Sequence, residues 1–132
     1  DRTGVMLQLP FPAGKHLDAL AGECETTDLF RVKCPGLEFS LSGVQNKVQQ
    51  YSQDHSPAQT AAYCLDSVCF AVKKATENAL AQYPGLDVVL SGGVASNSRL
   101  RRQMETFGAV FGAPQYSTDN AMGVAILANR LK

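Results

Sequence analysis

Apolar residues recur every three or four positions through the middle of the chain, which is the spacing of an amphipathic helix. The residues of this stripe are Ala61, Leu65, Val68, Val72, Ala75 and Ala79. Ser56-Pro-Ala-Gln59 precedes the stripe and has the pattern of a capping box, with Pro57 at the first helical position. Because Pro84 and Gly85 cannot continue a helix, we expect one long helix that ends before them.

Two short apolar runs follow, at residues 86–90 and 108–111, and each predicts a strand. Runs this apolar favour strands that are buried on both faces. The helix between them has its inner face at Leu100, Met104 and Phe107, after a cap at Ser96, Asn97 or Ser98. A final helix, capped by Thr118 or Asp119, would turn inward Ala121, Val124, Ala128 and Leu131. This order of elements is typical of an α/β domain with a parallel sheet and right-handed crossovers.

Residues 1–55 show a loop-rich pattern. Leu9-Pro-Phe-Pro-Ala-Gly14 interrupts any helix, and a short helix through Leu17, Leu20 and Ala21 is expected after it. Residues 29–33 and 38–41 predict a small hairpin. A second capping-box pattern, Ser42-Gly-Val-Gln45, predicts a helix with an inner face at Val44, Val48 and Tyr51. We therefore divide the chain into 1–55 and 56–132. Because two strands and a hairpin make a thin sheet for so many helices, we expect strands to be missing on the N-terminal side.

Composition limits what this chain can be. Its 132 residues suffice for one domain, and 45% of them are hydrophobic while 18% are charged, which excludes a disordered chain. Twelve basic residues balance twelve acidic ones, so there is no overall positive field for binding nucleic acid without sequence preference. No apolar run approaches the ~18–20 residues needed to cross a bilayer. Since the chain begins Asp1-Arg-Thr-Gly, without Met, we expect a piece of a longer protein.

The cysteines indicate a reducing compartment. Cys24, Cys34, Cys64 and Cys69 include no CxxC pair, so neither a zinc ribbon nor a thioredoxin-type site is supported. We expect four free thiols and a cytoplasmic protein.

The strongest candidate for chemistry is Ser91-Gly-Gly-Val-Ala-Ser-Asn-Ser98, between the first strand and the next helix. Paired glycines at a strand end allow either a tight structural turn or close approach of a ligand to the backbone. Ligands of α/β sheets bind beyond the carboxyl ends of strands, which favours the second interpretation. Asp119 follows the second strand, where it either caps the last helix or faces the same crevice as a cation ligand.

Other polar groups are weaker candidates. Arg99, Arg101 and Arg102 lie on one predicted helix and are most simply a solvated face, with contact to a polyanion as the alternative. His16 and His55 form no metal-binding pair. We expect each to be a surface histidine or a satisfied core histidine.

Four motifs together resemble one family. Leu9-Pro-Phe-Pro-Ala-Gly14, Phe39-Ser-Leu-Ser-Gly43, the segment 90–100 and Ser117-Thr-Asp-Asn-Ala121 occur in the order seen in the tRNA threonylcarbamoyladenosine transferases. These proteins are also called glycoproteases or O-sialoglycoprotein endopeptidases. The chain is similar to their C-terminal portion only. It has Ala13-Gly14-Lys15 where the family usually has Gly-Gly-Pro, which indicates a divergent member.

The resemblance implies an actin-like ATPase (RNase H-like) fold and transfer of threonylcarbamoyl from an adenylate to an adenosine amine in tRNA. It implies that Asp1 and Gly14 contact the adenylate sugar, and that Gly92, Gly93 and Asn97 hold the adenosine part. Asp119 corresponds to a ligand of one divalent metal, iron or zinc, whose other ligands come from an HxxxH helix in the family's N-terminal part. The partners implied are tRNA and other proteins of the threonylcarbamoyl pathway.

For the piece itself we expect no cofactor, no activity, and self-association through the surface where strands are missing. The alternative is a non-catalytic paralogue that serves as a scaffold or partner-binding module of the same fold. A sugar or acetate kinase of the same superfamily is a third reading, but no acidic residue is evident for its chemistry.

Overall fold

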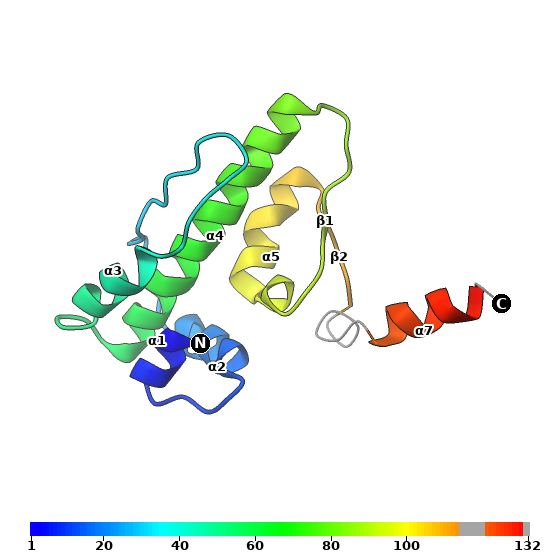
Figure 1. The fold of residues 1–132 in the computed structure, drawn as a ribbon. Coiled ribbons are helices and arrows are strands. Elements are labelled where there is room, and N and C mark those ends of the chain that lie inside the picture. Colours follow the sequence, from blue (N-terminus) through cyan, green and yellow to red (C-terminus); the bar gives the residue numbers. More distant parts are fainter. Residues whose placement is uncertain (114–120, 131–132) are drawn as a thin grey trace.

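The computed structural model describes residues 1–113 and 121–130, and one long helix organises them. This helix is α4 (Pro57–Gln82), and three of the other helices pack against it (Figure 1). Its predicted start is confirmed. The Ser56 hydroxyl accepts a hydrogen bond from the Gln59 amide (3.2 Å), and the Gln59 side chain accepts one from the Ser56 amide (2.9 Å). The helix ends at Gln82, and its C-cap is Tyr83, directly before Pro84.

Three shorter helices precede α4 in the chain: α1 (Arg2–Met6), α2 (Ala13–Gly22) and α3 (Val44–Tyr51). Helices α2 and α3 pack on α4, while α1 packs on α2 and α3. A Cβ atom on Gly4 would lie 2.2 Å from that of Ala13, so α1 and α2 meet where only glycine fits. The inner positions predicted for α2 and α3 are buried at Leu17, Ala21, Val44 and Val48.

The predicted hairpin at 29–33 and 38–41 is wrong. No strand occurs between residues 23 and 43, and this segment instead lies along α4 (Figure 1). Side chains of α4 bind its backbone: the Ser67 hydroxyl accepts from the Phe30 amide (2.8 Å), and Asn78 Nδ2 donates to the carbonyls of Cys34 (3.2 Å) and Gly36 (2.6 Å). Because α4 supplies these partners, the two halves of the segment need not pair with each other.

The second capping box, predicted at Ser42–Gln45, is also wrong. Helix α3 has Gly43 as its N-cap and receives no capping hydrogen bond from a side chain. The Ser42 hydroxyl pairs instead with that of Ser40 (2.9 Å), and the Gln45 side chain accepts from Arg2. The helix forms where predicted, but its packing rather than its cap holds it there.

Two short strands, β1 (Val89–Leu90) and β2 (Val110–Phe111), form a parallel pair in which Val89 faces Val110 and Leu90 faces Phe111. Between them lie a 3-10 turn η1 (Val94–Ser96), helix α5 (Ser98–Met104) and a second 3-10 turn η2 (Glu105–Phe107). The parallel pairing and the predicted inner face of the intervening helix are confirmed, since Leu100 and Met104 are buried against Cys69 of α4. The structure is therefore a mostly helical α/β fragment.

The expectation that both strands are buried on two faces is wrong. Leu90 and Phe111 pack toward α5, but Val89 is 69% exposed and Val110 is 60% exposed. Successive side chains of a strand point to opposite faces, and α5 covers only one face of the pair.

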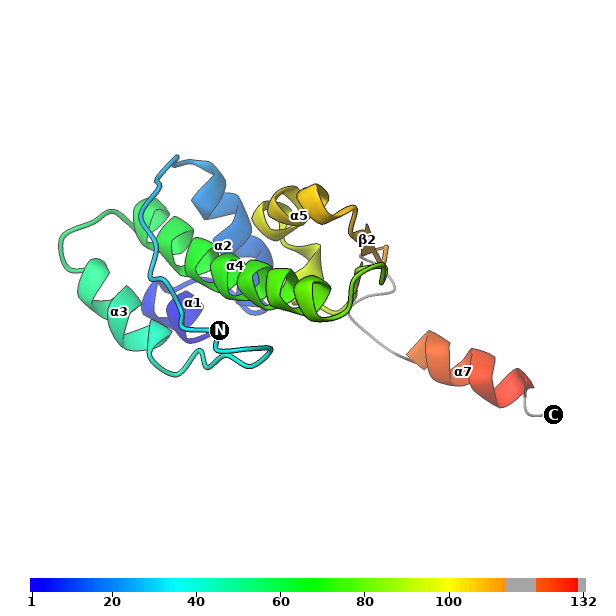
Figure 2. The ribbon, with the colours of Figure 1, turned by 90° about the horizontal axis from the view of Figure 1, so that it is seen from above.

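The last helix, α7 (Ala121–Arg130), lies apart from the other elements in both views (Figures 1 and 2). Residues 126–130 are all exposed, so the inward position predicted for Ala128 is wrong. Thr118, Asp119 and Leu131 lie outside the described residues. Within the described part of the chain, no helix combines the length and the apolarity that crossing a membrane requires.

Candidate functional site

The turn after β1 is built on the paired glycines. Gly92 has a φ of +97°, a conformation that favours glycine, and η1 follows with amide-to-carbonyl bonds from Ala95 to Gly92 (3.1 Å), Ser96 to Gly93 (3.2 Å) and Asn97 to Val94 (3.1 Å). Gly93 is different. Its φ is −59°, it is exposed, and a Cβ atom there would meet nothing within 4 Å. Neither backbone conformation nor packing inside the described chain requires glycine at position 93.

Asp18 of α2 holds the end of this turn through three hydrogen bonds. Its carboxylate accepts hydrogen bonds from the Asn97 side-chain amide, the Ser98 hydroxyl and the Ser98 backbone amide, each at 2.9 Å. The Asn97 side-chain oxygen accepts from the Leu100 amide (2.9 Å), so Asn97 is the N-cap of α5. Both ends of the Asn97 amide are thus engaged within the protein, and its role here is to shape the turn.

Gly14 lies on the same helix as this aspartate. Gly14 lies four residues before Asp18 in α2, and residues four apart share one face of a helix. Gly14 is exposed, and a Cβ atom there would meet nothing within 4 Å. Asp18 therefore binds Asn97, the residue that follows the glycine turn, while Gly14 lies one helical turn before Asp18 in α2.

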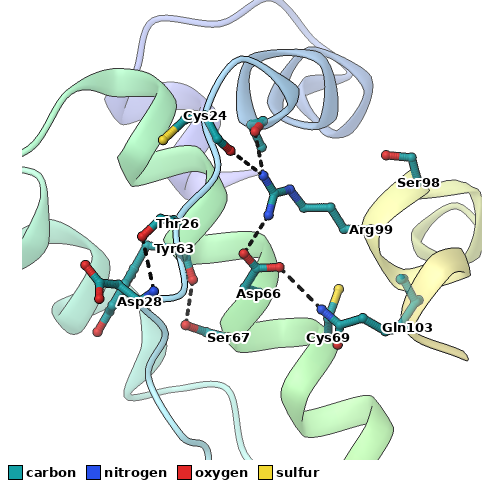
Figure 3. Close-up of polar contacts among 12 residues, drawn as sticks. Cys24, Thr26, Asp28, Tyr63, Asp66, Ser67, Cys69, Ser98, Arg99 and Gln103 are labelled. Carbon is teal, nitrogen blue, oxygen red and sulfur yellow. Dashed lines mark hydrogen bonds and ion pairs between the residues drawn. The ribbon is translucent and has the colours of Figure 1, made fainter.

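Arg99 corrects the interpretation of the arginines as a solvated face (Figure 3). Its guanidinium pairs with Asp66 of α4 (2.7 Å) and donates to the carbonyls of Ala21 (2.6 Å) and Cys24 (2.8 Å) at the end of α2. Gln103 adds a longer bond to the other Asp66 oxygen (3.4 Å). This buried network joins α2, α4 and α5.

Arg101 also has partners within the protein. Its Nε donates to the Ala95 carbonyl (2.9 Å), its Nη2 donates to the Gly112 carbonyl (3.0 Å), and the guanidinium lies over the Phe111 ring at 4.7 Å. Arg102 alone of the three is exposed, as predicted for the group.

Asp1 occupies another part of the surface. It is exposed at the start of α1 and lines an open cleft of about 390 Å³, whose lining contains none of the other predicted site residues. Asp119 lies outside the described residues. Among residues 1–113 and 121–130, no group of three His, Cys, Asp or Glu side chains could hold a metal ion, so the described part of the chain does not by itself fit the implied metal.

The cysteines and His55 behave as structural residues. All four cysteines are free, as expected, and burial raises the pKa of Cys69 to about 12, which leaves that thiol unreactive. His55 stacks on Tyr51 and its Nδ1 lies 2.8 Å from the Tyr51 carbonyl oxygen. It is a satisfied histidine, as predicted.

Sequence reasoning missed Asp18 and Asp66. A signal existed for Asp66, because it is the one charged residue of the otherwise uncharged stretch 61–72. A lone charge on an apolar helix has to be paired when the helix is buried. Asp18 offered no comparable signal, since its partners lie about 80 positions away in the chain.

A glycine turn at the carboxyl end of a parallel strand, followed by a capped helix, places this chain in the α/β class, whose open sheets commonly have their ligand sites at this edge. Residues 1–126 match the family model described as tRNA N6-adenosine threonylcarbamoyltransferase. Similar proteins of that name include one from Carboxydothermus hydrogenoformans, 34% identical over 137 residues, with 95% of this chain and 41% of the relative covered. Another, from Chloroherpeton thalassium, is 30% identical over 158 residues, with 98% of this chain and 44% of the relative covered.

The chain belongs to the tRNA N6-adenosine threonylcarbamoyltransferase family. It spans about two fifths of the length of the curated relatives that it matches.

Proposed function

We propose that this chain is the adenylate-binding C-terminal part of a tRNA N6-adenosine threonylcarbamoyltransferase, and that it forms part of an actin-like lobe. The family membership supports the reaction. The assignment to such a lobe is supported by the parallel pairing of β1 with β2, which α5 connects along the chain.

In the proposed reaction, the N6 nitrogen of a tRNA adenosine attacks the carbamoyl carbon of a threonylcarbamoyl adenylate. A C–N bond forms, the bond between that carbon and a phosphate oxygen breaks, AMP leaves with the electron pair, and one N6 proton is lost. The residues of this chain contribute by positioning the adenylate. Gly92 and Gly93 offer a backbone surface to the adenosine part, Gly14 approaches the sugar, and Asp18 with Asn97 keeps these segments together.

One observation carries the proposal: Gly93 lies directly after the carboxyl end of β1, and neither its helical φ nor any neighbouring atom of the described chain requires glycine there. Glycine in a helical conformation costs about 1 kcal/mol relative to alanine, so its use at this exposed position, where α/β sheets bind ligands, favours close approach by a ligand. The Oγ of Ser96, in the same turn, is buried and without a hydrogen-bond partner among the described residues.

Two further assignments depend on the rest of a longer protein. We assign Asp1 to the adenylate sugar and Asp119 to the metal, iron or zinc, as one ligand of a set that this chain does not complete. When bound, the metal would supply positive charge for the phosphate and carbamoyl oxygens. We also assign the protein to the cytoplasm, where tRNA and free thiols coexist, with tRNA and other pathway proteins as partners.

The substitution Gly93→Ala tests the adenylate site. A methyl group has room within the described chain, so folding is unaffected, but it projects where the adenylate would lie. In the full-length protein, we expect the Kd for AMP, measured by calorimetry, to rise about tenfold or more, which is at least about 1.4 kcal/mol.

The matched control is Gly22→Ala, at the last residue of α2, where a Cβ atom also meets nothing within 4 Å. Equal AMP affinity in the Gly93 and Gly22 variants would contradict an adenylate site at this turn. AMP binding without transfer of threonylcarbamoyl to tRNA would favour the non-catalytic paralogue instead.

A further inference from the structure

The turn after β1 and the end of β2 are joined by a single side chain. Arg101, on α5, donates from Nε to the carbonyl of Ala95 in η1 and from Nη2 to the carbonyl of Gly112, directly after β2. The two bonds are 2.9 and 3.0 Å long, and the guanidinium plane rests over Phe111 at 4.7 Å. One planar group thus contacts η1, the last residue of β2 and the residue that follows β2.

The backbone alone holds this turn weakly. The bonds within η1 are local, from each amide to the carbonyl three residues back. Such 3-10 bonds have poorer geometry than those of an α-helix. The ladder between the strands ends with the Gly112 amide donating to Leu90 (3.0 Å), one residue before the turn begins. Arg101 continues the connection past that point, because it ties Ala95 to Gly112 after the strands have stopped pairing.

We propose that Arg101 is a positioning residue for the adenylate-binding turn: its guanidinium holds η1, and with it Gly92 and Gly93, against the carboxyl end of β2. This role rests on the proposed function of the turn. Arg101 does not itself touch the adenylate in this assignment, and it acts through the carbonyl of Ala95.

The chemistry requires arginine rather than a positive charge alone. The guanidinium presents donors in a rigid fork and a flat face that stacks on an aromatic ring. A lysine carries one compact ammonium on a flexible stem, so it can reach one carbonyl but cannot hold both and cover Phe111. We therefore expect Arg101→Lys to restore only part of what Arg101→Gln loses.

The first measurement is hydrogen exchange in the full-length protein without ligand. In Arg101→Gln, we expect the amides of Ala95, Ser96 and Asn97 to exchange about tenfold faster, because the turn opens more often. The control is Arg102→Gln, which removes the same charge from the next residue, an exposed one, and should leave these amides unchanged. Arg101→Lys should give an intermediate rate.

The second measurement separates positioning from folding. In Arg101→Gln, we expect the Kd for AMP to rise about tenfold and the KM for tRNA to stay within about twofold, because a misplaced turn affects the adenylate and not the acceptor. Unchanged amide exchange in both Arg101 variants overturns the proposal. So does unchanged AMP affinity in Arg101→Lys if the Gln variant fails to fold.

The two proposals fail in different ways. If Gly93→Ala leaves AMP binding unchanged, the adenylate site is wrong. If Gly93→Ala weakens AMP binding while both Arg101 variants bind AMP like the unsubstituted protein, the site stands and the positioning role of Arg101 is wrong.

Discussion

Asp66 brings a carboxylate into the packed middle of α4, where its side chain is 10% exposed and Arg99 lies 2.7 Å away. Burial raises the pKa of Asp66 above its ordinary value, and the charge and hydrogen bond of Arg99 offset this only in part. The ion pair therefore joins α4 to α5 without fully offsetting the cost of burying the Asp66 carboxylate.

The pH dependence of stability tests this balance. Because the folded pKa of Asp66 is raised, the folded state binds its proton more tightly than the unfolded state does, and the contribution of Asp66 to the free energy of unfolding falls as pH rises from about 4 through the folded pKa. Asp66→Asn removes this contribution. Urea unfolding between about pH 3 and pH 7 should show that the substitution costs less stability at pH 7 than at pH 3. A greater cost at pH 7 would mean that the pair with Arg99 outweighs burial.

Among the elements, two helices carry the same cap pattern with different results. Both Ser56–Gln59 and Ser42–Gln45 match the capping box, but only the first forms it. At Ser56, an extended residue before Pro57 presents the hydroxyl to the Gln59 amide. At the start of α3 the N-cap falls instead on Gly43, which has a helical φ and ψ, and both members of the predicted box bind elsewhere.

Alanine substitutions distinguish these two serines. Ser56→Ala removes a capping hydrogen bond of α4 and should lower the free energy of unfolding by about 1 kcal/mol. Ser42→Ala removes only a bond between exposed serines and should change it by less than about 0.5 kcal/mol. Urea denaturation of both variants gives the comparison, and equal losses would contradict the assignment of the caps.

The loop along α4 shows why local patterns mislead at this scale. Residues 29–33 and 38–41 have the composition of strands, yet the Phe30 amide binds Ser67, and the carbonyls of Cys34 and Gly36 between the two runs bind Asn78, some forty positions away. A hairpin requires its two halves to be each other's best partners. Here side chains of α4 bind the backbone of the first run and of the connection instead.

For the whole molecule, the outer face of the two-stranded sheet is an apolar surface that no other described element covers. Val89 and Val110 face each other across the strands and are more than half exposed, and Leu86 and Val94 nearby are each 63% exposed. On helix α7, which lies apart from the sheet, Ile126 and Leu127 are 47% and 59% exposed. Large exposed apolar patches on a soluble protein commonly mark an interaction surface.

We predict that the 132-residue chain self-associates through this sheet face, with a second copy covering Val89 and Val110. Light scattering should show dimers or larger species at high concentration, and Val89→Gln with Val110→Gln should shift them toward monomer. Val5→Gln, at a 77% exposed position on α1, is the matched control and should not. Monodisperse monomer of the unsubstituted chain would contradict the prediction.

The sequence by itself determined the elements whose signal is local. The course of α4, the turn at Gly92 and Gly93, and the alternation of helices and strands after residue 56 all follow from periodicity, caps and glycines within a few positions. The four family motifs could likewise be read from the chain without coordinates.

Only the tertiary structure decided which distant groups meet. It placed Asp18 against Ser98, 80 positions away, paired Asp66 with Arg99, and replaced the hairpin with a loop bound to α4. The physical reason is that a buried polar group takes whichever partner the packing of other elements brings within about 3 Å, and no pattern along the chain specifies that partner.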